Sequence, residues 1–271
     1  MFGKNSYIHV HDANTRRFKQ EGDISYADWT ESIPEGFRVY ITGDTDYSNI
    51  KVGDLVSIGR PGFICSIALY DTQNTVLQNI VINAAQGCGV LENLGSGTII
   101  NGVTIKKGEK PPGAYEERLL SINRDGFHLN APKGGTTVQN SYVEFCGDDA
   151  INIRSYFAKV THVGSNNVIN FEPNGTHFAP GSQLYIYDQN QFTLKDTVNV
   201  RQHQMEQPWA EVERISNIQY GNLIVSRQHT QNFRIINNKF YDIDARGIVA
   251  TGSDIYIERN IIQRTTMGGI W

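Results

Sequence analysis

The sequence is poor in cysteine, in clusters of basic residues and in long apolar runs. Its three cysteines, Cys65, Cys88 and Cys146, are an odd number and lack the spacing of metal-ligand motifs. We therefore expect neither a full disulfide framework nor a zinc site. Buried thiols that pack as small apolar side chains are the simpler interpretation.

Neither sign of charge dominates the chain. It has 24 Lys and Arg against 28 Asp and Glu, a formal net charge of −4, and the basic residues are not gathered in one stretch. Nucleic-acid binders need such a basic footprint, so we expect no nucleic-acid partner. No apolar run is long enough to cross a bilayer, and none follows the opening Met1-Phe2-Gly3-Lys4-Asn5 as in a signal peptide, so we expect no membrane partner.

A short repeat is present in spite of these absences. Five segments carry apolar residues at every second position, which is the strand period, and each contains an asparagine at a turn. These asparagines are Asn79, Asn101, Asn140, Asn238 and Asn260. Units of this length cannot bury their apolar faces alone and must stack. The sequence therefore predicts an all-β fold, a right-handed parallel β-helix (solenoid), with the five asparagines stacked as a ladder at one corner.

A second set of positions recurs eight or nine residues after the asparagines in four of the five coils, and its members should also stack in a column. Its members are Cys88, Asp125, Asp149, Arg246 and Gly268. After this column, apolar and polar residues alternate along each segment. When the segments are aligned, His128 corresponds to Asn152 and Asn130 corresponds to Arg154. Since the aliphatic and aromatic members should point inward, we expect these polar members to line an exposed groove.

Two insertions interrupt the repeat and divide the chain. We expect an N-terminal β segment with a barrel-like insert (1–70), coils that carry the active site (71–154), an inserted β-barrel-like unit (155–230) and further coils (231–271). The loop from Lys106 to Leu120 and the inserted unit are expected to close the groove into a pocket. A pocket of this kind favours a substrate that is bound by its end over one bound along its middle. The chain stops within a repeat without a capping segment, so we expect a fragment of a longer protein.

Three aspartates are candidate acid and base residues. Asp125 and Asp149 should lie on adjacent rungs about 4.8 Å apart, with Asp148 beside them. Like charges so close raise one another's pKa, so one carboxyl should hold a proton near neutral pH. A protonated acid beside ionised carboxylates is what glycoside hydrolysis requires, without a metal or cofactor. Five further side chains are expected to bind substrate: His128, Asn130, Asn152, Arg154 and Arg246.

Two motifs carry a resemblance to a known family. The segments Asn123–Asn130 (NRDGFHLN) and Cys146–Arg154 (CGDDAINIR) resemble the active-site region of glycoside hydrolase family 110, whose members are exo-acting, inverting α-1,3-galactosidases. The resemblance extends over roughly residues 51–271. It implies that Asp125 is the proton donor, that Asp148 and Asp149 activate water, that the substrate is a glycan with terminal galactose, and that the protein is secreted or periplasmic.

Other functions stay open from the sequence. Polygalacturonases share the paired aspartates but add Gly-His-Gly and Arg-Ile-Lys motifs, which this chain lacks; it has Ala245-Arg246-Gly247-Ile248 where the histidine motif is expected. A polysaccharide lyase would need a Lys or Arg base, for which Arg154 and Arg246 are available. A non-catalytic glycan-binding β-helix, such as an adhesin or tail-spike segment, would use the aspartates only to bind hydroxyls. A homo-oligomer is compatible with each of these functions.

Overall fold

The computed structural model of the protein describes residues 6–19, 25–42, 48–59, 64–130, 133–155, 157–172, 178–204, 207–226 and 230–271. These residues form strands, turns and bends and contain no helix. Accordingly, no helix in this part of the chain has the length and hydropathy needed to span a bilayer. Two compact units are present, one made of residues 1–154 and 232–271 and the other of residues 155–231.

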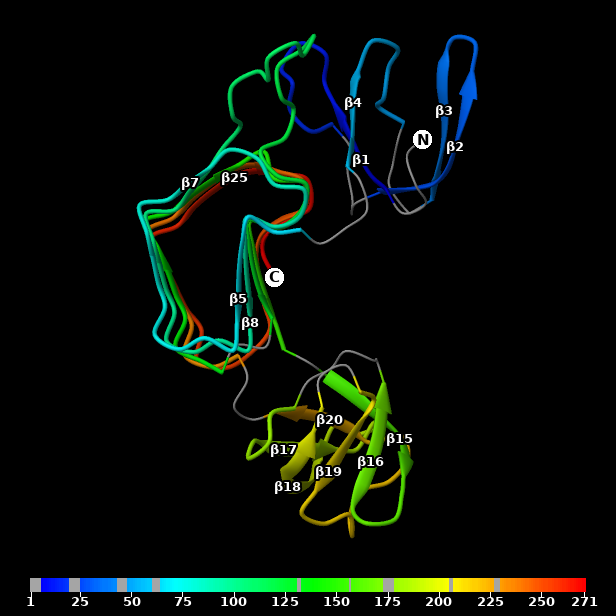
Figure 1. Ribbon diagram of the computed structural model, residues 1–271, viewed down its shortest axis with the longest axis vertical. Coiled ribbons are helices and arrows are strands. Elements are labelled where there is room, and N and C mark those ends of the chain that lie inside the picture. Colours follow the sequence, from blue (N-terminus) through cyan, green and yellow to red (C-terminus); the bar gives the residue numbers. More distant parts are fainter. Residues whose placement is uncertain are drawn as a thin grey trace. The chain divides into compact units, whose positions relative to one another are not determined.

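The larger unit contains a stack of coils whose strands form three parallel sheets (Figure 1). The first sheet has the order β26 (Gly268–Ile270), β23 (Arg246–Ala250), β14 (Ile151–Arg154), β11 (Phe127–Asn130), β8 (Val90–Asn93) and β5 (Ile67–Tyr70). The second has β24 (Tyr256–Glu258), β21 (Arg234–Ile236), β12 (Thr137–Gln139), β9 (Ile99–Asn101) and β6 (Val76–Gln78). The third has β25 (Ile261–Thr265), β22 (Lys239–Ile243), β13 (Tyr142–Glu144), β10 (Thr104–Ile105) and β7 (Val81–Ile82). The predicted all-β parallel β-helix is confirmed.

The strand period explains why these segments stack. In the first sheet Phe127 pairs with Ile151, and Ile151 pairs with Ile248; all three side chains are fully buried in the interior of the coils. Because every coil repeats this column, the apolar residues of successive rungs bury one another. The interior cluster is continuous through the stack and includes residues from all three sheets.

The asparagines of the repeat share one corner, as predicted, but they occupy three neighbouring columns and do not form one continuous ladder. The corner position itself has a positive φ and is taken by Asn79, Gly102, Asn140, Asn237 and Arg259. Asn101 comes one position before it, whereas Asn238 and Asn260 follow it by one. Glycine and asparagine adopt a left-handed backbone at lower cost than most residues, which accounts for their recurrence here.

Two short ladders replace the single one. On the outer side, Asn140 Nδ2 donates to Asn101 Oδ1 at 2.8 Å, and Asn237 Nδ2 donates to Asn140 Oδ1 at 2.7 Å. On the inner side, Asn238 Nδ2 donates to Asn260 Oδ1 at 2.9 Å. The amides thus satisfy one another where the strand pairing is interrupted.

The N-terminal segment forms an antiparallel sheet beside the coils. Its order is β3 (Gly36–Thr42), β2 (Ser25–Ile33), β1 (Ser6–His11) and β4 (Leu55–Gly59). In the described residues this sheet is open, whereas the sequence predicted a barrel-like insert here. All six side chains of β1 are buried.

The smaller unit is a closed antiparallel barrel. Its strands follow the order β15 (Phe157–Val163), β16 (Val168–Glu172), β19 (Trp209–Val212), β18 (Leu194–His203), β17 (Gln183–Tyr187) and β20 (Leu223–Ser226). It has its own apolar core, in which Phe171 packs edge-on against Phe178 with ring centroids 5.2 Å apart. The chain leaves the coils after β14 and returns at β21, so the barrel is an insertion within one coil.

Small residues flank the aspartate column. Gly89, Gly126, Ala150 and Gly247 are aligned on successive rungs directly after it. A Cβ added at Gly126 would lie 2.5 Å from the carbonyl oxygen of Ala150 and 3.1 Å from the methyl groups of Val143. The close approach of the backbones therefore depends on the missing side chain.

We predict that Gly126→Ala lowers the free energy of unfolding by ~1–3 kcal/mol, because the added methyl group overpacks the coil interior. Urea denaturation followed by circular dichroism measures this change. Gly164→Ala is the control, since its added Cβ would lie 3.5 Å from its nearest neighbour, at ordinary van der Waals distance. Equal stability of the two variants would contradict this account of the column.

Candidate active site

One column of the first sheet carries the candidate catalytic residues. The strand register aligns Cys88 with Asp125, Asp125 with Asp149, and Asp149 with Arg246. The backbone confirms this alignment, because Gly126 N donates to Asp149 O at 2.9 Å and Ala150 N donates to Arg246 O at 3.0 Å. The predicted column is therefore confirmed, and it places two carboxylates on adjacent rungs.

The site is buried, whereas the sequence predicted an exposed groove. Asp125 and Asp149 are each only 2% exposed, and His128 and Asn152 are buried as well. Part of the cover comes from β1, whose Tyr7 ring lies 4.4 Å from the Arg124 guanidinium and whose His9 ring approaches Gly147 closely. Arg124 and Gly147 flank the aspartates in sequence, so the N-terminal sheet closes this side of the coils.

Hydrogen bonds hold the two buried carboxylates in place. His128 Nδ1 lies 2.6 Å from Asp125 Oδ2. Asn152 Nδ2 donates to Asp149 Oδ2 at 3.0 Å and lies 3.5 Å from Asp125 Oδ1, so one amide spans both carboxylates. Arg246 contributes its backbone N–H, 3.0 Å from Asp149 Oδ1, and its guanidinium, 3.5 Å from the same oxygen.

Asp148 completes the group from the adjacent turn. It is half-buried, and its Oδ1 accepts the backbone N–H of Asp149 at 3.0 Å. One oxygen from each of Asp125, Asp148 and Asp149 lies within 4.8 Å of the others. These nearest oxygens are closer than the separation of about 6.5 to 9.5 Å between acid and base in inverting hydrolases.

Burial and like charge act together on Asp149. Removal of the carboxyl from water, together with the nearby Asp125 carboxylate, raises the pKa of Asp149 to about 7, although Arg246 opposes the shift. Because the two carboxyls interact strongly, the proton belongs to the pair as much as to one residue. A carboxyl group that holds a proton near neutral pH is therefore present in the cluster.

Two thiols extend the column below Asp125. Cys88 Sγ lies 3.7 Å from Asp125 Oδ2, and a hydrogen bond from Cys88 lowers the pKa of the Cys65 thiol to about 7. Two sets of three ligand atoms within 4.8 Å of one another are found in the described residues: Cys88 with Asp125 and His128, and Asp125 with Asp148 and Asp149. Either set could hold a cation; the absence of a metal from the reaction stays a prediction.

Not every predicted residue reaches the cluster. Asn130 pairs with Arg154 at the far end of β11 and β14, two residues beyond His128 and Asn152. Arg154 is exposed and Asn130 is half-buried. The structure brings His128, Asn152 and Arg246 into direct contact with the aspartates and leaves Asn130 and Arg154 at the edge of the site.

The sequence did not reveal a buried histidine and aspartate pair beside the cluster. His9 Nδ1 of β1 contacts Asp244 Oδ2, and both side chains are fully buried. Asp244 follows Cys146 and Gly147 on the next rung, since Asp244 N donates to Cys146 O at 3.0 Å. Nothing in the spacing of the two residues predicts this contact, because it joins the N-terminal sheet to the turn between β22 and β23.

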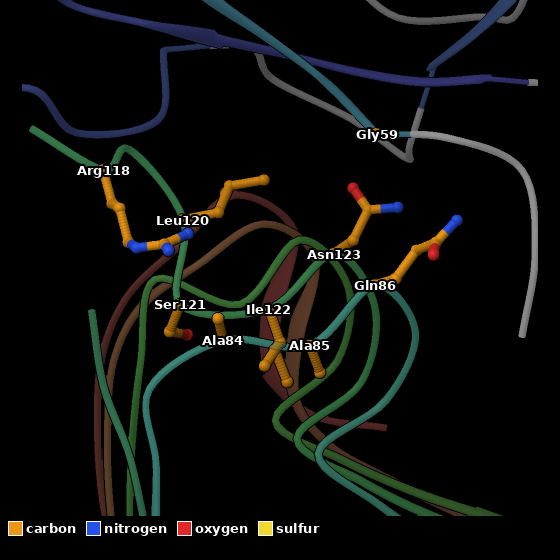
Figure 2. A pocket seen from close by; sticks show the side chains of 9 residues that line it. All are labelled: Gly59, Ala84, Ala85, Gln86, Arg118, Leu120, Ser121, Ile122 and Asn123. Carbon is orange, nitrogen blue, oxygen red and sulfur yellow. The ribbon is translucent and has the colours of Figure 1, made fainter. Parts of the chain in front are cut away.

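A cavity of about 240 Å³ lies at the neighbouring corner (Figure 2). Its lining comes from two successive coils, the inserted loop and the end of β4: Gly59, Ala84, Ala85, Gln86, Arg118, Leu120, Ser121, Ile122 and Asn123. Asn123 is 6% exposed and comes two residues before Asp125. The cavity is therefore close to Asp125 in sequence, although none of the three aspartates is among its lining residues.

The pKa of Asp149 predicts how stability depends on pH. Its folded value of about 7 lies above the unfolded value of about 3.9, so the folded state binds more protons between these limits. This contribution to stability is full below pH about 4 and is lost as the pH rises through about 7. We expect the wild type to lose more unfolding free energy than Asp149→Asn between pH about 4.5 and 7.5 in urea titrations. Parallel pH profiles would contradict the assignment.

The buried pair at β1 predicts a stability effect. His9→Ala leaves the Asp244 carboxylate buried without its imidazole, so the unfolding free energy should fall by ~1–3 kcal/mol. Thermal and urea denaturation measure this loss. His162→Ala, at an exposed position of β15, serves as the control and should change stability by less than about 0.5 kcal/mol. A His9 variant as stable as the control would show that the contact contributes nothing.

The chain is similar to several curated proteins that share one activity in their names. No family model matches the chain. Alpha-1,3-galactosidase B of Parabacteroides distasonis is 31% identical over 94 residues, which are 35% of this chain and 15% of that protein. Alpha-1,3-galactosidase A of Shewanella woodyi is 28% identical over 129 residues, 45% of this chain and 20% of that protein. A protein named alpha-1,3-galactosidase B in Phocaeicola vulgatus is 24% identical over 258 residues, 86% of this chain and 42% of that protein.

The chain thus spans less than half the length of these curated relatives. The similarity supports the resemblance to α-1,3-galactosidases found in the two aspartate motifs. It is a similarity at low identity, between 24% and 31%, to several proteins named alpha-1,3-galactosidase A or B.

Proposed function

We propose that the chain is a glycoside hydrolase that removes terminal α-linked galactose from glycans by inversion. The observation that carries this proposal is the cluster of Asp125, Asp148 and Asp149 on adjacent rungs, in which one carboxyl has a pKa of about 7. Glycosidases need one protonated and one ionised carboxyl at the same bond. The names of the relatives supply the sugar and the linkage, and both remain part of the proposal.

The proposed reaction takes its roles from the resemblance to inverting α-1,3-galactosidases, although the nearest carboxylate oxygens lie closer together than is typical of inverting enzymes. Asp125 donates its proton to the glycosidic oxygen as the bond to the anomeric carbon breaks. Asp148 or Asp149 takes a proton from a water molecule, whose oxygen forms the new bond on the opposite face of the sugar. The released sugar then carries the inverted configuration, and no covalent enzyme intermediate forms.

The side chains around the carboxylates act mainly on them. His128 orients Asp125, and Asn152 links Asp125 to Asp149. Arg246 holds Asp149 Oδ1 through its backbone and guanidinium and stabilises the ionised form. Binding of sugar hydroxyls is left to the half-buried Asp148 and to the outer residues Asn130 and Arg154.

The inserted loop supports action on chain ends. Arg118 and Leu120 of this loop line the cavity beside Asn123. The loop is also tied to the N-terminal segment, since Arg16 donates to the carbonyl oxygen of Glu117 at 2.8 Å and pairs with Glu116 at 3.2 Å. A wall on this side of the site favours a terminal sugar over the middle of a polymer.

The raised pKa of Asp149 offers a second assignment of roles. A proton held by Asp149 would make it the acid and Asp125 the base, with the same cluster and the same overall reaction. The two assignments differ in which variant responds to the leaving group. A good leaving group needs little protonation, so it rescues the loss of the acid but not of the base.

The test is hydrolysis of p-nitrophenyl α-galactoside and of an α-1,3-linked galactosyl disaccharide by the wild type and by Asp125→Asn, Asp148→Asn and Asp149→Asn. With the disaccharide, loss of the acid or of the acting base should lower kcat by at least about 100-fold, whereas with p-nitrophenyl α-galactoside, whose leaving group needs little protonation, only loss of the base should have an effect of this size. Asp254→Asn, at an exposed position, is the matched control and should retain wild-type activity. A chelator should not change the rate. Activity only on internal bonds of a polymer, or no loss on substitution of the aspartates, would refute the proposal.

Rescue of Asp125→Asn by an activated aryl galactoside supports Asp125 as the acid; rescue of Asp149→Asn instead supports the exchanged roles. Proton NMR of the first-formed sugar tests inversion. β-galactose is expected from an α-galactoside, whereas α-galactose would mean retention.

A further inference from the structure

Two cysteines lie opposite each other just before β5 and β8, the last two strands of the first sheet (Figure 1). The ladder of backbone hydrogen bonds aligns Cys65 with Cys88. Before the pair, Gly87 N donates to Ile64 O at 2.7 Å; after it, Ser66 N donates to Cys88 O at 3.1 Å. Paired strands are about 4.8 Å apart, which lies within the Cα separation of about 4.4 to 6.8 Å found in disulfides. The backbone therefore already holds the two cysteines at bridging distance.

The two thiols differ in exposure and in protonation. Cys65 is half-buried, whereas Cys88 is fully buried. The hydrogen bond from Cys88 lowers the pKa of the Cys65 thiol to about 7. The same hydrogen bond, together with burial, raises the pKa of Cys88. Near neutral pH a large fraction of Cys65 is therefore thiolate, the reactive form, while Cys88 keeps its proton.

The third cysteine of the chain is not part of this pair. Cys146 is fully buried in the interior of the coils, where a parallel bridge aligns it with Ile122. Its thiol donates to Asp148 O at 3.2 Å, and burial raises its pKa well above the usual range. The fold thus pairs Cys65 with Cys88 and leaves Cys146 as a packed, protonated thiol.

Cys88 connects the thiol pair to the aspartate cluster. Its Sγ lies 3.7 Å from Asp125 Oδ2, the oxygen that His128 Nδ1 approaches to 2.6 Å. Cys65, Cys88 and Asp125 occupy one column on three successive rungs. A bond between the two sulfurs would remove the S–H donor of Cys88 and turn its sulfur toward the rung below. The covalent state of Cys88 therefore acts directly on the surroundings of Asp125.

The pair also joins the end coil of the described stack to the coil above it. The strands of this coil, β5, β6 and β7, are edge strands of their sheets in the described residues. Several of its apolar side chains are exposed, among them Tyr70, Val76 and Val81. A coil with one neighbour is less supported than a coil with two. A crosslink would close a loop of 88 − 65 = 23 residues around this coil and restrict the unfolded chain.

We propose that Cys65 and Cys88 are an oxidation site, at which a reversible disulfide crosslinks the end coil, withdraws the Cys88 thiol from Asp125 and lowers turnover. The oxidant is a peroxide, and the smallest is hydrogen peroxide. The effect on turnover rests on the proposed function, whereas formation of the disulfide does not.

The oxidation proceeds in two steps. The Cys65 thiolate attacks one oxygen of hydrogen peroxide, the O–O bond breaks, and the leaving hydroxide takes up the proton that Cys65 had lost. The Cys88 sulfur then attacks the sulfur of the resulting sulfenic acid. The S–O bond breaks, and the second hydroxide leaves as water with the Cys88 proton. Two thiols are thereby oxidised to one disulfide, and one peroxide is reduced to two water molecules.

Mass spectrometry tests the bridge. After treatment with hydrogen peroxide and digestion with chymotrypsin, which cuts at Tyr70 between the two cysteines, a peptide pair joined through Cys65 and Cys88 is expected. Dithiothreitol should separate the pair. The variant Cys65→Ser should give no joined peptides, and Cys146 should remain a thiol that is alkylated after unfolding. Absence of the joined pair from the oxidised wild type, or a bridge to Cys146, would overturn the proposal.

Urea denaturation tests the crosslinking of the end coil. The urea midpoint of the oxidised wild type should be higher than that of its reduced form, because the crosslink restricts the unfolded chain. The midpoint of Cys65→Ser should be the same with and without peroxide. Equal midpoints for the two forms of the wild type would refute this part of the inference.

Hydrolysis of the α-1,3-linked galactosyl disaccharide tests the effect on Asp125. Oxidation should lower kcat about three- to tenfold, the effect of one lost hydrogen bond, with little change in KM. Dithiothreitol should restore kcat. Cys65→Ser should match the reduced wild type and resist peroxide, since it leaves the Cys88 thiol at Asp125. Cys88→Ala should reproduce the loss in kcat without peroxide, and Cys88→Ser, whose hydroxyl replaces the donor, should recover part of it.

The outcomes separate this inference from the proposed function. A bridge that forms without a change in kcat would refute the action on Asp125. Absence of hydrolysis by the reduced protein would refute the proposed function, and the effect on turnover with it, while the mass spectrum still decides whether the oxidation site exists.

Discussion

In-register stacking of parallel coils is the constraint on which the site depends. Each strand pairs with the corresponding strand of the next coil, so side chains of one column are held about 4.8 Å apart. For apolar columns this spacing is favourable, because Phe127, Ile151 and Ile248 bury one another. For the neighbouring column it forces Asp125 and Asp149 together, where their charges repel. The same repeat that builds the core therefore also builds the carboxylate cluster.

The N-terminal sheet determines how strongly this repulsion acts. Exposed carboxylates at this spacing would be screened by water, but the strand β1 lies against the flanking Arg124 and Gly147. Burial then adds to the repulsion, and the two effects together bring the pKa of Asp149 to about 7. The His9 and Asp244 contact helps to hold this cover in place. The raised pKa of Asp149 thus depends on an element outside the repeat.

Periodic features could be read from the sequence, whereas contacts between non-repeating elements could not. The spacing-two pattern and the recurring column predicted the parallel β-helix and the alignment of Asp125, Asp149 and Arg246. The single asparagine ladder was wrong because the backbone at the corner selects Asn or Gly at one position, while neighbouring asparagines serve other hydrogen bonds. The exposed groove was also wrong, since no repeat signal reveals that β1 covers it.

The column is not symmetric about the carboxylates, and this asymmetry bears on their roles. Arg246 lies above Asp149, and the thiol of Cys88 lies below Asp125. Since the pair shares a proton, the two possible role assignments differ in the location of that proton and not in the fold. The pKa of Asp149 favours the proton there in the free protein, but the cation beside it also stabilises its ionised form. The position of the bound glycosidic oxygen therefore decides which of the two carboxyls donates the proton.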